Sequence, residues 1–183
     1  MGMPSADDAD RWVASARRGD GGFDELYRWL AGPVASFARA RGAPDPEGLA
    51  NETFLRVFRA VDRFEGDGAA MRTWVFSIAR NLVIDAHRAR ARRPEIVDAS
   101  VPERSAEAAD TAALRNLADG EVAALLSTLT DEQREVVVLR LVADLSLAET
   151  AEIVGRPVTA VKRLQARALR SLQREILGEG VSS

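Results

Sequence analysis

Residues 146–177 read SLAETAEIVGRPVTAVKRLQARALRSLQREIL, and this stretch decides how the C-terminal part of the chain folds. Thr130 followed by Gln133 fits a capping box, which predicts a helix start near Asp131. Ser146 followed by Glu149 fits a second capping box, so a short helix is predicted to start near Leu147. It ends at Gly155, and a longer helix is predicted over residues 159–177. A short helix, a tight turn and a longer basic helix form the plan of a helix-turn-helix, whose second helix lies in the major groove of DNA.

The second of these helices is strongly basic, since no acidic residue occurs between Arg156 and Arg174. Arginine and lysine near the start of such a helix can donate hydrogen bonds to base edges, and those further along can neutralise phosphates. A solvated amphipathic helix is the alternative, but it would normally carry acids that form i,i+4 pairs with the arginines. The predicted base contacts are Arg156, Thr159, Lys162 and Arg163, and the predicted phosphate contacts are Arg167 and Arg170.

The N-terminal half predicts three helices that share a core. Apolar residues recur at three- and four-residue steps between Phe23 and Phe37, which indicates a first helix. Asp45 suits an N-cap and Pro46 the first helical position, so a second helix is expected to run to about Asp62. Its inward residues are expected to be Phe54, Val57, Phe58 and Val61. The chain before the first helix, including Asp7 and Asp8, is expected to be a mobile terminus.

A third long helix is predicted to carry an apolar face and to end in an arginine-rich run before Pro94. Trp74 and Phe76 stand close to Arg72, Arg80 and Asn81 in this helix. Aromatic rings beside guanidinium groups can stack on unpaired bases and hold a separated strand. A core position is an equal alternative for Trp74, and Phe76 is expected to be buried.

Between these halves the composition changes to proline, serine, alanine and acids, with little apolar periodicity. The sequence therefore predicts an all-α fold with two small helical domains joined by a flexible acidic linker, the C-terminal domain being a helix-turn-helix. The predicted bounds are 8–93 for the first domain, 94–113 for the linker and 114–178 for the second domain.

Composition removes several classes of function. The chain has no cysteine and one histidine, His87, which excludes thiol nucleophiles, disulfides and the usual zinc sites. No glycine-rich phosphate cradle follows a strand, so no catalytic residue, metal or cofactor is expected and the chain is predicted not to be an enzyme. No apolar run approaches the roughly 20 residues that cross a bilayer, so a cytoplasmic protein without membrane insertion is expected.

Four segments together resemble the extracytoplasmic-function (ECF) sigma factors of bacterial RNA polymerase. LANETFLRVF at 49–58 and RTWVFSIARNLVID at 72–85 are similar to the first conserved domain of that family. LTDEQREVVVLR at 129–140 and AETAEIVG at 148–155 are similar to its second. The segments also follow one another in the family's order, and this makes the match far more specific than a helix-turn-helix alone.

The resemblance implies a sigma factor that binds core RNA polymerase and directs promoter recognition and transcription initiation. It implies polymerase contacts by Leu49, Asn51, Glu52 and Leu55. The loop from Phe64 to Met71 and the following helix would recognise and melt the minus-10 element, and the last helix would read the minus-35 element. The implied minus-10 contacts are Asp67, Arg72, Trp74, Arg80, Asn81 and Arg88. Core polymerase and promoter DNA are the expected partners, with an anti-sigma factor as a further partner that holds the chain inactive.

Two other functions are open from the residues alone. A stand-alone helix-turn-helix activator or repressor would bind duplex sites as a dimer without polymerase. A helical adaptor would bind only proteins, and replacing Arg163 and Arg167 by alanine would leave its activity unchanged.

Overall fold

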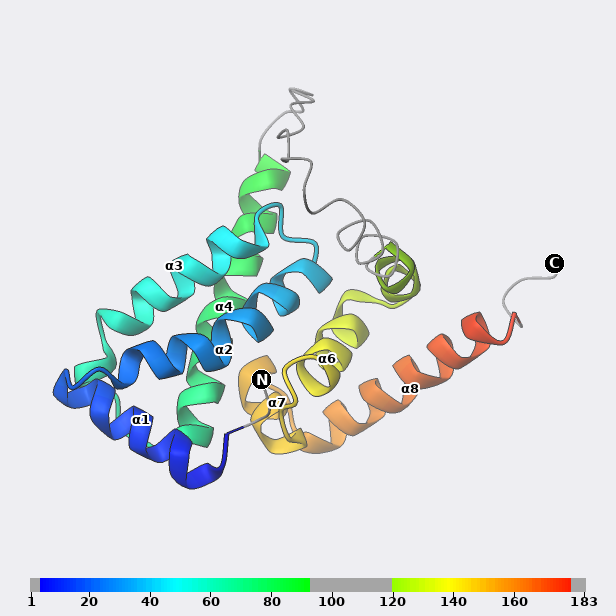
Figure 1. The fold of residues 1–183 in the computed structure, drawn as a ribbon. Helices are drawn as coiled ribbons and strands as arrows, with labels where there is room; N and C mark the ends of the chain where they lie inside the picture. The colour runs from blue at the N-terminus through cyan, green and yellow to red at the C-terminus, as the bar shows by residue number, and fades with distance from the viewer. Residues whose placement is uncertain (1–3, 93–119, 179–183) are drawn as a thin grey trace, which may run out of the picture.

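The computed structural model describes residues 4–92 and 120–178, and every regular element in these ranges is helical (Figure 1). This confirms the predicted all-α class. Residues 120–127 are also helical. The named elements are α1 (Ala6–Arg18), α2 (Gly22–Ala40), α3 (Pro46–Phe58), the short 3₁₀ helix η1 (Val61–Arg63), α4 (Gly68–Arg92), α6 (Asp131–Leu141), α7 (Leu147–Val154) and α8 (Val158–Ile176).

Helices α1 to α4 form an N-terminal unit around one core. α2 packs against both α1 and α3, and α4 closes the unit by packing against all three. The Phe37 ring from α2 meets the Phe76 ring from α4 edge to face, with their centroids 5.8 Å apart, and both side chains are fully buried. The expectation that Phe76 is buried is thus confirmed. Burying two phenyl rings of this size contributes several kcal/mol of hydrophobic stabilisation.

The expectation of a mobile terminus at Asp7 and Asp8 is wrong, because both residues lie in the first turn of α1. Ser5 caps this helix, and its hydroxyl accepts a hydrogen bond from the Asp8 backbone N–H. Acids in a first turn are favoured by the helix dipole. Ala9 and Val13 anchor the other face of α1 in the core. Ser5 and the two acids that follow it therefore mark the start of a helix.

The inward position predicted for Phe58 is also wrong. Phe54, Val57 and Val61 are buried as expected, but 62% of Phe58 is exposed. α3 ends at Phe58 rather than near Asp62, and η1 follows after a short turn, so the apolar spacing no longer continues on one helical face. The Phe58 ring remains at the surface, where it meets the Phe23 ring edge to face.

Helices α6, α7 and α8 form the C-terminal unit. Both predicted capping boxes are present, Thr130 with Gln133 at α6 and Ser146 with Glu149 at α7. Each box satisfies two backbone N–H groups that a helix start would otherwise leave free. α6 packs against α8, and α7 packs against both.

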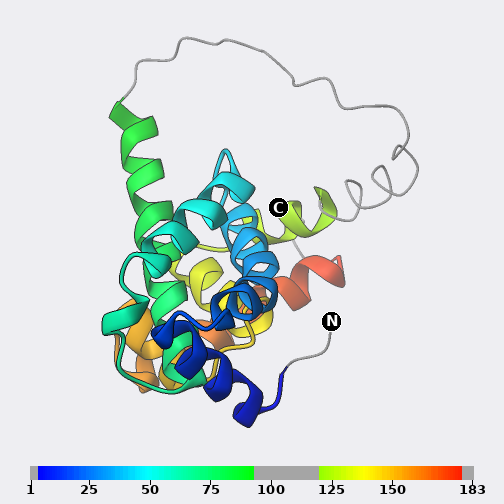
Figure 2. The same ribbon diagram turned by 60° about the vertical axis from the view of Figure 1, so that its left-hand side comes forward.

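The two units are in direct contact. α4 packs against α7 and α2 packs against α6, so that one cluster of buried apolar side chains runs through both units. The two views show the last turns of α4 projecting beyond the other helices (Figure 1, Figure 2). The predicted linker, 94–113, lies outside the described residues. Within the described parts, no helix combines the length and the apolar character needed to cross a membrane.

The start of α2 has no space for a side chain. A Cβ added to Gly22 would lie 2.3 Å from the Trp12 carbonyl oxygen and 2.7 Å from the Ala16 backbone nitrogen. We expect Gly22→Ala to lower the free energy of unfolding by about 1–3 kcal/mol, because backbone atoms of α1 must move. Urea unfolding followed by circular dichroism measures this.

Gly32→Ala in the same helix is the matched control. A Cβ there would meet nothing within 4 Å, so alanine should stabilise the protein by roughly 0.5–1 kcal/mol through its better helix propensity. Equal effects of the two substitutions would contradict the steric account of Gly22.

Candidate nucleic-acid interface

The turn between α7 and α8 has the geometry of a helix-turn-helix. Gly155 ends α7 with φ 66° and ψ 37°, a left-handed conformation that costs glycine little. The backbone N–H of Arg156 donates to the Ala151 carbonyl over 3.0 Å, which closes the end of α7. Pro157 then adopts extended backbone as the N-cap of α8. The predicted start of the final helix at about Thr159 is within one residue of the observed start.

α8 carries a basic outer face opposite a small apolar stripe. Val161 and Ala168 are buried and hold the helix on α6 and α7. In the described residues no acid forms an ion pair with a basic side chain of α8 between residues 158 and 174, and all the predicted contacts on this helix are exposed. They share one helical face through steps of three and four residues: Thr159, Lys162, Arg163, Arg167 and Arg170.

Arg156 differs from the other predicted base contacts. Its guanidinium forms an ion pair with Glu132 at the start of α6. Both side chains are about half exposed, so the pair is weakly held. Arg156 therefore stands beside the exposed face of α8 but is tied to α6 in this structure.

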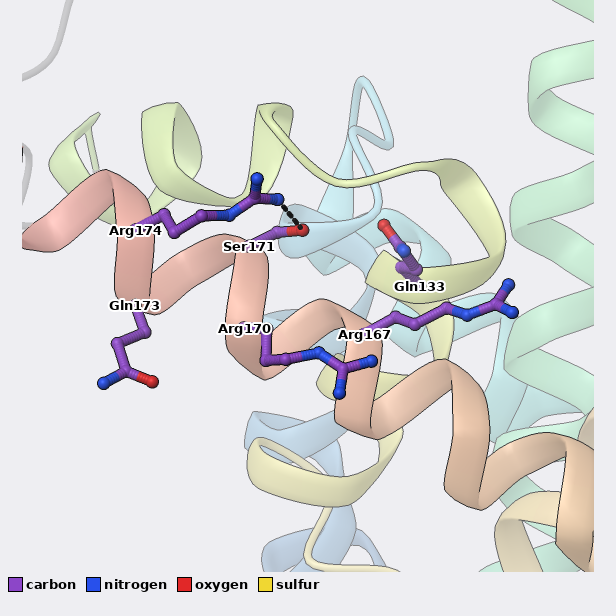
Figure 3. A pocket seen from close by; sticks show the side chains of 6 residues that line it. All are labelled: Gln133, Arg167, Arg170, Ser171, Gln173 and Arg174. Carbon is purple, nitrogen blue, oxygen red and sulfur yellow. Dashed lines mark hydrogen bonds between the residues drawn. The ribbon is translucent and has the colours of Figure 1, made fainter. Parts of the chain in front are cut away.

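Arginines of the C-terminal half of α8 line a hollow of about 670 Å³ (Figure 3). The sequence predicted Arg167 and Arg170 at this place, but not the lining residues Gln133 and Ser171. Gln133 comes from α6, where the sequence indicated only its capping role. Arg174 completes the hollow and donates to the Ser171 hydroxyl over 3.4 Å. A hollow with three guanidinium groups attracts anions such as backbone phosphates.

The residues predicted on and before α4 do not form one surface. Trp74, Asn81 and Arg88 are seven residues apart and lie on the same face of the helix, because seven residues make nearly two turns. Asn81 and Arg88 are exposed, and Trp74 is half-buried. The core position considered for Trp74 is thus only partly correct. Its ring stacks on Phe64 with the centroids 5.0 Å apart.

Asp67 takes a structural place at the start of α4. Its carboxylate accepts a hydrogen bond from the Ala70 backbone N–H over 2.8 Å. The neighbouring Gly68 N–H donates to the Asp10 carboxylate of α1 over 2.7 Å. These two acids satisfy backbone donors that α4 leaves free at its N-terminus. Sequence reasoning did not find Asp10, since 58 residues separate it from Gly68.

Arg72 and Arg80 point to the C-terminal unit and are ion-paired there. Arg72 lies 2.8 Å from a Glu149 carboxylate oxygen of α7, and Arg80 lies 3.0 Å from a Glu135 carboxylate oxygen of α6. Burial raises the pKa of Glu149, but hydrogen bonds from Ser146 and Arg72 outweigh it and hold this pKa below its ordinary value. The carboxylate is therefore ionised when it meets Arg72.

Arg41, at the end of α2, reaches the same place. Its guanidinium donates to the Asp131 carbonyl over 2.9 Å and lies 3.7 Å from the Glu135 carboxylate. Burial lowers the pKa of Arg41 despite these partners. The Glu135 carboxylate thus stands between two arginines, Arg41 and Arg80, that both belong to the other unit.

The predicted polymerase contacts lie on α3 beside exposed apolar side chains. Leu55 is 49% exposed, and Phe58 lies nearby on the same helix. Asn51 accepts a hydrogen bond from the Tyr27 hydroxyl, and Glu52 pairs with Arg56. Leu49 is half-buried against the core. Leucine and phenylalanine exposed this close together are typical of a protein-binding surface.

Comparison with known proteins bears on both units. The family model "Sigma-70 region 2" matches residues 23–93, and "Sigma-70, region 4" matches residues 125–174. The solved structure of CnrH in complex with the cytosolic domain of CnrY has a TM-score of 0.71 and 27% sequence identity. The similarity covers 94% of this chain and 99% of that one.

Curated relatives are similar at the level of sequence. The ECF RNA polymerase sigma factor SigD of Mycobacterium tuberculosis is 34% identical over 180 residues, which cover 93% of this chain and 85% of SigD. The ECF RNA polymerase sigma factor BldN of Streptomyces coelicolor is 35% identical over 156 residues, covering 82% of this chain and 56% of BldN. The chain thus spans about half the length of BldN and most of that of SigD. It belongs to the ECF RNA polymerase sigma factors, a non-enzymatic family with sigma-70 regions 2 and 4 that directs promoter recognition.

Proposed function

We propose that this sigma factor divides promoter recognition among three helices. α8 reads the minus-35 element as duplex DNA, α4 with the loop before it holds the melted minus-10 strand, and α3 binds core RNA polymerase. In this proposal residues 8–93 are the region 2 domain, residues 94–113 are a flexible acidic linker, and residues 114–178 are the region 4 domain. The chain acts in the cytoplasm, where the polymerase works.

The exposed basic face of α8 is the main support for duplex binding. Thr159, Lys162 and Arg163 stand in the first two turns, where a helix in the major groove meets base edges. Arg167 and Arg170 follow at the hollow of Figure 3 and suit phosphates. Arg156 becomes a further DNA contact when its guanidinium leaves the Glu132 carboxylate and binds DNA instead.

The exposed face of α4 supports strand capture. Trp74 offers an aromatic ring at the surface, and Asn81 and Arg88 extend this face along the helix by one heptad each. Stacking on an aromatic ring is worth about 1–3 kcal/mol per base, which offsets part of the cost of unpairing. Asp67 contributes by fixing the start of α4, and Arg72 and Arg80 add positive charge on another side of the same helix.

The apolar surface of α3 supports polymerase binding. Leu55 and Phe58 provide the anchor, and the polar side chains of Asn51 and Glu52 form its edge. Leu49 holds the helix against the core. We include Phe58 in this surface on the basis of its exposure.

An inhibitory partner is also part of the proposal. CnrH was solved with the cytosolic domain of CnrY, and its similarity to this chain covers almost all of both. We propose that this chain also binds an inhibitory protein, an anti-sigma factor that keeps it from the polymerase.

In-vitro transcription tests the proposed function directly. Core polymerase with the purified chain should start RNA at a limited set of positions on a library of genomic fragments, mapped by sequencing 5′ ends. Arg163→Ala with Arg167→Ala should reduce these starts by about tenfold or more, since each lost DNA contact is worth roughly 1–3 kcal/mol. Starts that do not depend on the chain, or a double variant with full activity, would refute the proposal.

Phosphate neutralisation by Arg167 predicts a salt effect. Binding of the purified chain to a mixed-sequence duplex should weaken linearly on a log–log plot against salt, and Arg167→Ala should make the slope less negative by about 0.9. Fluorescence anisotropy between 50 and roughly 200 mM salt measures both slopes. Arg17→Ala on α1 is the control, because Arg17 is exposed and lies outside the proposed interface. An equal slope for wild type and Arg167→Ala would remove the phosphate contact.

Leu55→Ser should weaken assembly with core polymerase by about 10- to 100-fold, the range expected for an apolar anchor in an interface. The substitution should leave the melting temperature nearly unchanged, since half of the side chain is already exposed. Val122→Ser, another exposed apolar position, is the matched control. Equal assembly of both variants, measured by biolayer interferometry, would exclude Leu55 from the surface.

A further inference from the structure

The basic side of α4 is covered by carboxylates from the C-terminal unit. Glu149 meets Arg72 at 2.8 Å, and both oxygens of Glu135 accept from Arg80, at 3.0 and 3.3 Å. These pairs are largely buried, whereas the other face of α4, with Asn81 and Arg88, is open. The N-terminal unit thus binds two carboxylates of its own chain where arginines could bind phosphates.

We propose that α6 and α7 mask α4 in the free protein, with Glu135 and Glu149 occupying the guanidinium groups that bind the phosphates of a single DNA strand. The inference rests on the proposed function of α4 and adds its regulation. A carboxylate and a phosphate both offer two oxygens to the planar guanidinium fork, so they compete for the same donors. Only one of the two occupants can bind at a time.

The contact between the two units leaves some buried hydrogen-bond donors without a partner, and such a contact is easier to open. Nε of Arg72 and Nε of Arg41 are buried and have no hydrogen-bond partner among the described residues. Such groups forfeit their hydration without full compensation. Exchange of Glu135 and Glu149 for DNA phosphates and water would relieve both defects.

The mask is selective between the two DNA-binding surfaces. The basic face of α8 is not covered in the same structure, since Lys162, Arg163 and Arg167 are exposed. The closed form therefore weakens single-strand binding by α4, because the phosphate contacts of Arg72 and Arg80 are occupied, and leaves duplex binding by α8 open. This difference provides an internal control within one protein.

Glu135→Gln and Arg41→Gln test the mask from its two sides. Each removes one charge from the contact, and neither residue belongs to the proposed DNA or polymerase surfaces. We leave Glu149 unchanged because it also completes the capping box of α7. Small-angle scattering should give a larger radius of gyration for both variants than for wild type.

Affinity is measured by anisotropy with a labelled mixed-sequence 30-mer, as a single strand and as a duplex. Both variants should bind the single strand about 5- to 30-fold more tightly. This gain is expected if the open form, which alone binds through Arg72 and Arg80, is a minor population in wild type and the main one in the variants. Duplex affinity should change less than about twofold. Since both substitutions open the same contact, the double variant should gain no more than either single one.

Glu47→Gln is the matched control, since it removes an exposed ion pair with Arg39 inside the N-terminal unit. It should change neither the scattering nor the affinities. Unchanged single-strand affinity in folded variants that still support transcription would overturn the mask and leave the proposed function standing. Equal tightening by Glu47→Gln would also overturn it, because the effect would then be one of net charge. If the wild-type protein does not support transcription with core polymerase, the proposed function fails, independently of the mask.

Discussion

The arrangement of the two units depends on one buried carboxylate, that of Glu135, placed between Arg41 and Arg80. A carboxylate in a poorly hydrated contact is costly unless cations and hydrogen bonds replace its water. The N-terminal unit supplies both arginines and the C-terminal unit supplies the acid. Each unit can therefore bury this part of its surface only in the presence of the other. The surrounding apolar cluster likewise contains side chains of both units.

The three outer helices expose different kinds of side chain. α3 exposes Leu55 and Phe58 and suits a protein, whereas α8 exposes a row of cations between residues 162 and 174, beside the apolar Val158 and Leu169, and suits duplex DNA. α4 has two different sides, one open at Asn81 and one bound to acids through Arg80. In the proposed function these three helices meet duplex DNA, a single strand and polymerase, each on a surface of its own.

Helix boundaries could be predicted from the sequence wherever the residues that fix them lie close together in the chain. Ser146 and Glu149 cap α7, and Gly155 ends it, so the helix-turn-helix was predictable to within one residue. The basic face of α8 was predictable for the same reason, since spacing along one helix fixes which side chains share a face. Periodicity gave the wrong position for Phe58. The apolar spacing in the sequence continues past this residue, but the helix α3 ends there.

The helical class, the N-caps of α3, α6 and α7, the helix-turn-helix and the family were all predictable from the sequence, because each of these is encoded in short segments. Only the tertiary structure decided that Arg72 and Arg80 face Glu149 and Glu135 while Asn81 faces solvent. It also decided that Asp10 caps α4, 58 residues away. Pairings of this kind depend on how helices that are far apart in the sequence dock. No local pattern encodes docking, since the free energy of a buried charge is set by the partners that the fold brings to it.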